Sequence, residues 1–249
     1  MNEKDFFEEI KSYKLIANKS LGQNFLINPQ LARKIVELLA VEEKDKVLEI
    51  GSGLGSLSYF LTEKDNDVTL IDIDERMLMF LKKHFEDKAG TIIKKQNILR
   101  EDLSLFNKII GNLPYYITTS IMEKLLLEAV NAETIVLMTQ KEVYPKLLGS
   151  NKSPLSLFLN YVSTISSPID VGRNNFAPVP HVDSVVFVIT PNKNIKNKDN
   201  KTLFKMMKQL FLLRRKNILN NLTNLIKNKE KAREILDKMH IDTNKRPEE

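Results

Sequence analysis

The chain has 249 residues, 42% of them apolar, so it can bury one full core or one core plus a small second domain. It contains no cysteine and only three scattered histidines, which excludes disulfides and thiolate metal sites and predicts no metal. The first 14 residues mix acidic and basic side chains, and no run of about 18 apolar residues follows, so we expect no signal peptide, no membrane partner and a cytoplasmic protein.

The positive charge is concentrated near the C-terminus. Residues 1–190 contain 22 Lys and Arg against 25 Asp and Glu, whereas residues 191–249 contain 16 against 7. The polar stretch 190–201 has no helical periodicity and predicts a linker between these parts. We therefore expect a larger domain at 1–190 and a small basic helical domain at 191–249 that contacts a polyanion. The alternative is a solvated, lysine-rich surface.

Short apolar runs alternate with amphipathic stretches in the larger domain. In chain order, the patterns predict a helix at 31–40, a strand at 46–51, a helix at 57–64, a strand at 67–74, a helix at 77–85, strands at 91–96 and 108–111, a helix at 119–129 and a strand at 133–140. This alternation predicts an α/β fold with a mostly parallel sheet covered on both faces. Such sheets bind ligands outside the carboxyl ends of the strands, where the strand order switches.

A glycine-rich loop, "EIGSGLGSLS" (49–58), follows the first predicted strand. Its glycines allow a sharp turn and a close approach of the backbone to a ligand. The dinucleotide fingerprint G-x-G-x-x-G would need glycine where Ser56 stands, and the spacing is instead similar to the E-x-G-x-G-x-G motif of S-adenosylmethionine-dependent methyltransferases. Asp72 ends the next strand, where a carboxylate can accept hydrogen bonds from ribose hydroxyls. Gly51 and Asp72 thus predict an adenosine-type ligand without deciding between NAD and S-adenosylmethionine.

The tetrapeptide "NLPY" (112–115) ends another predicted strand and favours S-adenosylmethionine over NAD. The exocyclic amine of a nucleobase is a poor nucleophile because its lone pair is delocalised into the ring. The Asn112 side-chain oxygen and the Leu113 carbonyl can accept from the two amine hydrogens, Pro114 stiffens the turn, and Tyr115 offers a face for base stacking. The sequence therefore predicts methylation of a base amine.

Six stretches occur in a distinctive order and spacing: "SLGQNFLIN" (20–28), "EIGSGLGSLS" (49–58), "GNLPYYITTSI" (111–121), "QKEV" (140–143), "FAPVPHVDS" (176–184) and "FLLRRKNILNNL" (211–222). With them the chain resembles the ribosomal RNA adenine N6,N6-dimethyltransferases, the KsgA family, from about residue 12 to its C-terminus. The resemblance implies a Rossmann-like class I methyltransferase fold and S-adenosyl-L-methionine as cofactor. It also implies dimethylation of adenosines, two adjacent ones, in small-subunit ribosomal RNA during ribosome biogenesis.

The resemblance also implies roles for individual residues. Asn24 and Leu26 would close over the cofactor, Gly51 would meet its amino-acid end, and Asp72 would bind its ribose. The implied cofactor site comprises Asn24, Leu26, Glu49, Gly51, Gly53, Asp72, Asn97 and Asn112. The implied catalytic residues are Asn112, Leu113, Pro114, Tyr115 and Phe176, with Phe176 covering the base face opposite Tyr115.

Three positions depart from the family pattern. Ser52 replaces the usual proline, Asp72 replaces a frequent glutamate, and Asn97 replaces the aspartate that accepts from the cofactor adenine amine. An asparagine oxygen can still accept, but without charge, so we expect reduced cofactor affinity. The family generally continues beyond the final "KRPEE" into a last helix, so we expect an unusually short or truncated member.

Arg214, Arg215 and Lys216 form the densest cationic cluster of the basic part and are predicted to contact RNA phosphates. The alternative is a structural role in which their aliphatic stems cover the larger domain. Three further functions stay open: an Erm-type large-subunit methyltransferase, a non-catalytic RNA-binding assembly factor, and a DNA adenine methyltransferase. A DNA adenine methyltransferase would normally carry a separate target-recognition domain, for which the 59 residues after residue 190 leave little room. The expected partner is a pre-small-subunit particle, and the protein is expected to be a monomer.

Overall fold

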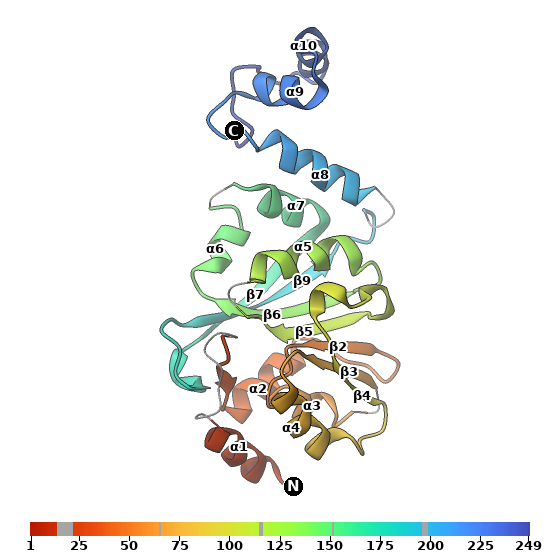
Figure 1. Cartoon of the computed structure of the whole chain (residues 1–249), viewed down its shortest axis with the longest axis vertical. Helices are drawn as coiled ribbons and strands as arrows, with labels where there is room; N and C mark the ends of the chain where they lie inside the picture. Colours follow the sequence, from red (N-terminus) through yellow and green to blue (C-terminus); the bar gives the residue numbers. More distant parts are fainter. Residues whose placement is uncertain (14–21, 65, 115–116, 151, 196–198) are drawn as a thin grey trace. The chain divides into compact units, whose positions relative to one another are not determined.

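The computed structural model describes residues 1–13, 22–64, 66–114, 117–150, 152–195 and 199–249. The chain divides into two compact units (Figure 1). The sheet unit comprises Met1–Tyr144 and Ser163–Lys193, and the helical unit comprises Pro145–Val162 and Asn194–Glu249. The helical unit thus includes a segment that precedes the boundary expected at residue 190.

The sheet unit is built on a seven-stranded sheet. Its spatial order is β4 (Thr91–Lys95), β3 (Asp67–Asp72), β2 (Lys46–Ile50), β5 (Lys108–Asn112), β6 (Thr134–Gln140), β9 (Ser184–Pro191) and β7 (Ser163–Val171). The strands from β4 to β6 are parallel, and β9 pairs antiparallel with both β6 and β7. The strand order reverses between β2 and β5, so a ligand crevice is expected at the carboxyl ends of these two strands.

The strands are apolar on both faces because helices cover both. One face presents alternate residues such as Val68, Leu70 and Val136 to a buried apolar cluster that includes side chains of the first helices. These helices are α1 (Glu3–Ser12), α2 (Pro29–Glu37), α3 (Ser58–Leu61) and α4 (Glu75–Phe85), and α5 (Thr118–Glu128) lies on the opposite face (Figure 1). The mostly parallel, doubly covered sheet predicted from the sequence is confirmed.

The elements predicted between residues 31 and 140 are all present, with ends that shift by at most three residues. Several elements were not predicted: α1, the paired β1 (Phe25–Leu26) and β8 (Phe176–Ala177), the antiparallel strands β7 and β9, and the short helices η3 (Ile98–Arg100), η4 (Leu103–Leu105) and η6 (Arg173–Asn175). β9 extends through Pro191, so the predicted linker begins later than residue 190.

The helical unit contains four helices among its described residues besides the C-terminal end of α6 (Val143–Leu147). They are α7 (Pro154–Val162), α8 (Asn200–Leu210), α9 (Ile218–Ile226) and α10 (Lys229–Lys238). Side chains of Asp199, Asn217 and Asn228 cap the last three by accepting a backbone N–H in the first turn. No described helix in either unit is both long and apolar enough to span a bilayer.

Candidate active site

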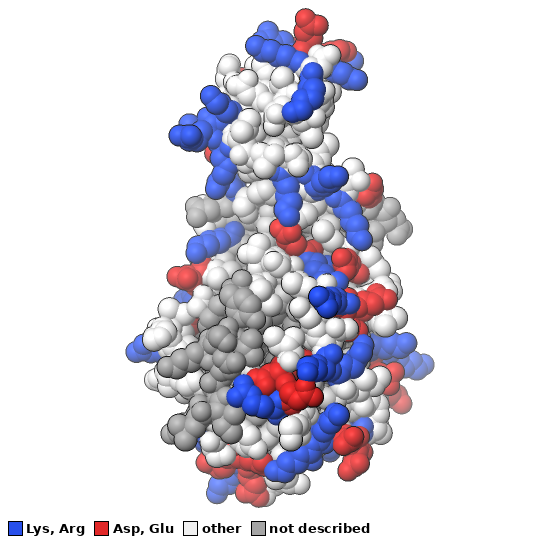
Figure 2. Space-filling view, viewed as in Figure 1, with Lys and Arg blue, Asp and Glu red and all other residues white. Residues whose placement is uncertain are grey.

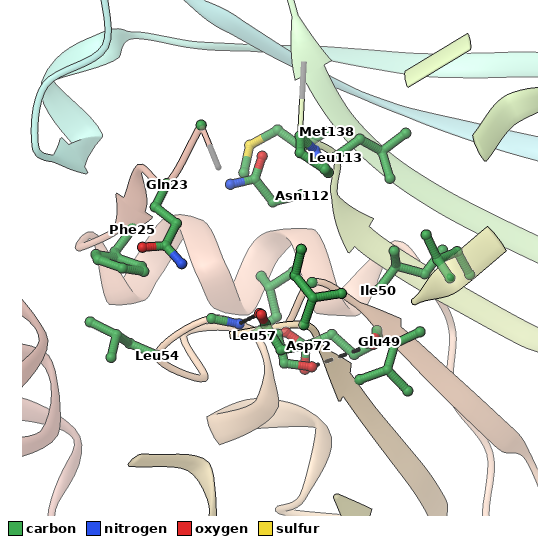
Figure 3. Close-up of a pocket in the computed structure, with 18 of the residues that line it drawn as sticks. Gln23, Phe25, Glu49, Ile50, Leu54, Leu57, Asp72, Asn112, Leu113 and Met138 are labelled. Carbon is green, nitrogen blue, oxygen red and sulfur yellow. Dashed lines mark hydrogen bonds between the residues drawn. The ribbon is translucent and has the colours of Figure 1, made fainter. Parts of the chain in front are cut away.

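A pocket of about 220 Å³ opens at the carboxyl ends of the parallel strands (Figure 3). This volume is several times the roughly 30 Å³ that a water molecule occupies in the liquid, so the pocket can hold an organic ligand. Its walls come from an N-terminal loop (residues 22–28), the glycine-rich loop after β2, and the residues that follow β3, β4 and β5. The pocket therefore lies where the strand order reverses, as the sequence predicted.

The glycine-rich loop has a conformation that side chains disfavour. Gly51 has a φ of 64°, in the left-handed region. Gly55 has a φ of 76°, and a Cβ there would lie 2.5 Å from the Phe85 ring of α4. Gly51 therefore shapes the ligand side of the loop, whereas Gly55 permits close packing of the loop against a helix.

The N-terminal loop is fastened over the pocket at several points. The Ser56 hydroxyl donates to the Leu26 carbonyl at 2.6 Å, and β1 pairs with β8, which places Leu26 opposite Phe176. The Asn112 amide nitrogen lies 3.4 Å from the Asn24 carbonyl oxygen. Ser56, which departs from the dinucleotide fingerprint, thus has a definite structural role in this loop.

A polar network joins the N-terminal loop to the end of β3. The Gln23 amide donates to Asp74 Oδ2 at 2.9 Å, and Arg76 donates to Asp74 Oδ1 at 2.9 Å through its Nε and also contacts Oδ2 through Nη2. Hydrogen bonding from Arg76 is the main reason why the pKa of Asp74 falls to about 2. Asp74 is therefore a fixed carboxylate that ties Gln23 to the pocket wall.

Two buried carboxyl groups lie beneath the glycine-rich loop. Asp72 accepts from the Gly53 N–H and the Asp74 N–H, each at 2.9 Å, and burial raises its pKa despite these bonds. Glu49, in β2, accepts from the Ser58 hydroxyl at 2.6 Å. Burial, reinforced by the nearby charge of Asp72, raises the pKa of Glu49 to about 8. Burial thus favours the protonated form of Glu49 in the free protein.

One end of the pocket suits a flat heteroaromatic ring. Asn97 follows β4, and its side-chain oxygen accepts from the Leu99 N–H at 2.9 Å. Ile73 and Leu99 both line the pocket and are 45% and 39% exposed, which is unusual for large apolar side chains. Apolar walls beside a polar amide would cover both faces of a ring and contact its edge.

The "NLP" segment at the end of β5 closes another side of the pocket. The Leu113 N–H donates to the Met138 carbonyl at 2.9 Å, and the Leu113 side chain is buried. The Pro114 carbonyl accepts from the Thr118 hydroxyl at 3.2 Å, which ties the segment to the first turn of α5. With its amide nitrogen directed toward Asn24, Asn112 keeps its side-chain oxygen for another donor (Figure 3).

Most of the predicted site residues line this one pocket. They are Asn24, Leu26, Glu49, Gly51, Gly53, Asp72, Asn97, Asn112, Leu113 and Pro114. Phe176 is not among the lining residues, and its side chain is only 1% exposed within the apolar cluster. Tyr115 lies outside the described residues. Arg214, Arg215 and Lys216 are exposed on the turn between α8 and α9 of the helical unit. The assigned roles remain predictions.

Sequence reasoning missed several residues that the structure brings to the pocket or its walls: Gln23, Ser56, Ser58, Asp74, Ile73 and Leu99. Gln23 and Asp74 stand beside predicted site residues, but their pairing joins positions 51 residues apart. Among the described residues, no group of three His, Asp or Glu side chains is arranged to bind a metal ion.

Comparisons with known proteins agree with this geometry. A family model described as ribosomal RNA adenine dimethylase matches residues 15–248. The ribosomal RNA small subunit methyltransferase A of Malacoplasma penetrans is 35% identical over 255 residues, which cover 99% of this chain and 92% of the relative. A crystal structure of a dimethyladenosine transferase from Plasmodium falciparum matches with a TM-score of 0.76 and 25% identity, over 89% of this chain and 90% of that one.

A second solved structure, of the 23S rRNA methyltransferase ErmE, matches with a TM-score of 0.67 and 24% identity, over 90% of this chain and 96% of that one. Together the two structures confirm the expected Rossmann-like class I S-adenosylmethionine-dependent methyltransferase fold.

Proposed function

Because the chain belongs to the ribosomal RNA adenine dimethylase family, we propose that it is a ribosomal RNA adenine N6,N6-dimethyltransferase that uses S-adenosyl-L-methionine. Its substrate is small-subunit ribosomal RNA, in which two adjacent adenosines each receive two methyl groups. The curated relatives are named for the small subunit, which favours this substrate over large-subunit RNA.

The position of Asn112 is the observation that carries this proposal. Its side chain projects from the end of β5 into the same pocket as Gly51 and Asp72, so an amine acceptor lies beside an adenosine-type subsite. The contact of its amide nitrogen with the Asn24 carbonyl directs the oxygen toward an incoming donor. A non-catalytic RNA-binding protein has no need of this arrangement.

The pocket residues fit the cofactor. Asp72 is held by two backbone N–H groups, and its remaining lone pairs can accept from ribose hydroxyls. Ile73 and Leu99 would supply apolar walls for the adenine ring, and Asn97 would lie at its edge. Gly51 and Glu49 line the same pocket and would lie beside the amino-acid end of the cofactor.

The protein contributes position and polarisation to the reaction. S-Adenosylmethionine supplies an electrophilic methyl group on a positively charged sulfur. The Asn112 oxygen and the Leu113 carbonyl accept from the two hydrogens of the target amine, which keeps the lone pair of the nitrogen available for attack. No strong base is required, because the amine becomes acidic once it is methylated and releases a proton to water. Tyr115 remains our predicted contact for one face of the base, whereas Phe176, predicted to cover the other face, is buried in the apolar cluster and does not line the pocket.

The helical unit supplies the RNA contacts in this proposal. Arg214, Arg215 and Lys216 are exposed and can neutralise backbone phosphates without reading sequence. The partner is then a pre-small-subunit particle in the cytoplasm, bound by a monomer of this chain.

The function is tested by incubating the protein with methyl-labelled cofactor and small-subunit particles that lack N6 methylation. We expect label in the RNA of these particles, recovered as N6,N6-dimethyladenosine at two neighbouring positions. Large-subunit particles serve as the control substrate. Label in large-subunit RNA instead would identify an Erm-type activity, and cofactor binding without transfer to either RNA would identify a non-catalytic assembly factor.

A further inference from the structure

Three adjacent cations of the helical unit stand on a short turn. Arg214, Arg215 and Lys216 are all exposed, and none of them forms an ion pair with a described residue. Elsewhere in the same unit, Lys238 pairs with Glu234 at 2.7 Å. On the face shown in Figure 2, Lys and Arg cover more of the C-terminal helices than Asp and Glu do. The cations of the turn are therefore available to an anionic partner.

A buried asparagine holds this turn in place. Asn221, in α9, is only 1% exposed. Its side-chain oxygen accepts from the Leu213 N–H at 3.0 Å, and its amide nitrogen lies 3.1–3.2 Å from the carbonyl oxygens of Leu213, Lys216 and Asn217. One side chain thus satisfies both ends of the segment that carries the three cations. A fixed turn loses less conformational entropy on binding than a mobile one.

The exposed side of α9 continues the polar surface. A shallow groove there is lined by one apolar side chain, Leu213, and by the polar side chains of Lys216, Asn220, Thr223, Asn224 and Lys227. Asn220 and Asn224 lie one turn apart on α9, and Lys227, the left-handed residue that caps the C-terminus of this helix, donates to the Asn224 side chain at 2.9 Å. Amide and ammonium groups in one row match a line of phosphate oxygens.

We propose that the 214–216 turn and the groove side of α9 form one binding surface for the phosphate backbone of RNA, and that Asn221 is the positioning residue that sets its geometry. This inference rests on the proposed function, since the RNA is the ribosomal substrate. It goes further in two ways. It adds Lys227 to the RNA-binding surface, and it attributes the fixed geometry of the turn to Asn221, a buried residue that would not itself contact RNA.

The test measures the affinity of the full chain for small-subunit particles without N6 methyl groups at several salt concentrations. The salt slope is the steepness with which the logarithm of the association constant falls with the logarithm of the salt concentration. Replacing all three turn cations with glutamine should lower this slope by up to about one unit per lost phosphate contact. Lys227→Gln should lower it by about one unit, whereas Lys238→Gln, on the same unit, should leave it unchanged.

Asn221→Ala should lower the salt slope by at least about one unit, and should add nothing when combined with the triple glutamine variant, because both remove the same contacts. Leu219→Ala is the matched control: it removes a buried apolar side chain from the same helix, so it should lower the melting temperature and leave the slope unchanged. If Asn221→Ala does not fold, Asn221→Asp replaces it, since aspartate keeps the volume and the acceptor but not the donors.

The outcomes separate the two proposals. A lowered slope in the triple variant with an unchanged slope in the folded Asn221 variant would overturn the positioning role alone. An unchanged slope in both the triple variant and Lys227→Gln, with a lowered melting temperature, would show that the cluster is structural and overturn the surface. Cofactor affinity and the identity of the methylated nucleoside would still test the catalytic proposal independently.

Discussion

Replacing Glu49 with glutamine tests the electrostatics of the pocket directly. Glu49 is 2% exposed in β2, and its carboxyl accepts from the Ser58 hydroxyl at 2.6 Å beside Asp72. Burial raises its pKa from 4.5 to about 8. Glutamine has the same size and can also accept from Ser58, but it carries no titratable proton.

The sign of the effect follows from the proton inventory. Between pH 4.5 and 8 the folded protein keeps the Glu49 proton that the unfolded chain has released, so the free energy of unfolding falls as the pH rises. The stabilising contribution of the proton is complete below pH 4.5 and is lost as the pH rises through 8. At 1.36 kcal/mol per pKa unit, the loss between pH 5 and pH 8 is about 3 kcal/mol.

The assay is urea unfolding of the cofactor-free protein at pH 5, 6, 7 and 8, followed by circular dichroism. The parent should lose about 3 kcal/mol more than Glu49→Gln over this range. Asp72, whose pKa is also raised by burial, titrates in both proteins, and because it interacts with Glu49 the difference between the two curves reports the pair of carboxyl groups. Glu142→Gln, at an exposed position, should follow the parent. If the free energy of unfolding changed with pH by the same amount in the parent and in Glu49→Gln, the reasoning would be refuted.

Three substitutions test the other walls of the pocket. Asn112→Ala should abolish methylation and leave the melting temperature nearly unchanged, because its hydrogen bond to Asn24 is long at 3.4 Å; activity within about threefold of the parent would contradict its role. Gly51→Val should prevent cofactor binding, since a β-branched residue is strained at a φ of 64°, and calorimetry that found parental affinity in a folded variant would show that the loop has been misinterpreted. Asn97→Asp should tighten cofactor binding by about three- to tenfold, because one oxygen keeps the bond to the Leu99 N–H while the second offers a charged acceptor; unchanged or weaker binding would count against the adenine contact.

The sequence was sufficient for the parallel part of the fold because the signals there are local. Apolar runs end at glycine or acidic residues, so the predicted strand at 46–51 corresponds to β2 at Lys46–Ile50 and the one at 67–74 to β3 at Asp67–Asp72. β1 and β8 are two residues long and pair across 150 positions, so no local pattern specifies them. β9 has a clear apolar run, but its place between β6 and β7 depends on tertiary pairing.

The site was predictable where a motif places residues at strand ends, and not where contacts cross the pocket. Gly51, Asp72 and Asn112 each end a strand and meet in one pocket. The protonation of Glu49 depends on burial, which a one-dimensional pattern does not contain. Asn221 stands beside the exposed Asn220 with the same side chain, and only the packing of α9 distinguishes the buried positioning residue from its neighbour.

If Glu49 lies beside the cationic end of the cofactor, as proposed, its raised pKa should make cofactor binding sensitive to pH. S-Adenosylmethionine carries a positive sulfonium and an ammonium group, so it binds better when Glu49 is a carboxylate, and the cost of removing the proton falls as the pH rises toward 8. The affinity for the cofactor should therefore increase from pH 6 to pH 8 by up to about tenfold per pH unit. Excess cofactor should accordingly raise the melting temperature more at pH 8 than at pH 6. Glu49→Gln should lose this dependence, and S-adenosylhomocysteine, which lacks the sulfonium charge, should show less of it in the parent. An equal rise at both pH values in the parent would mean that the cationic part of the cofactor does not interact with Glu49.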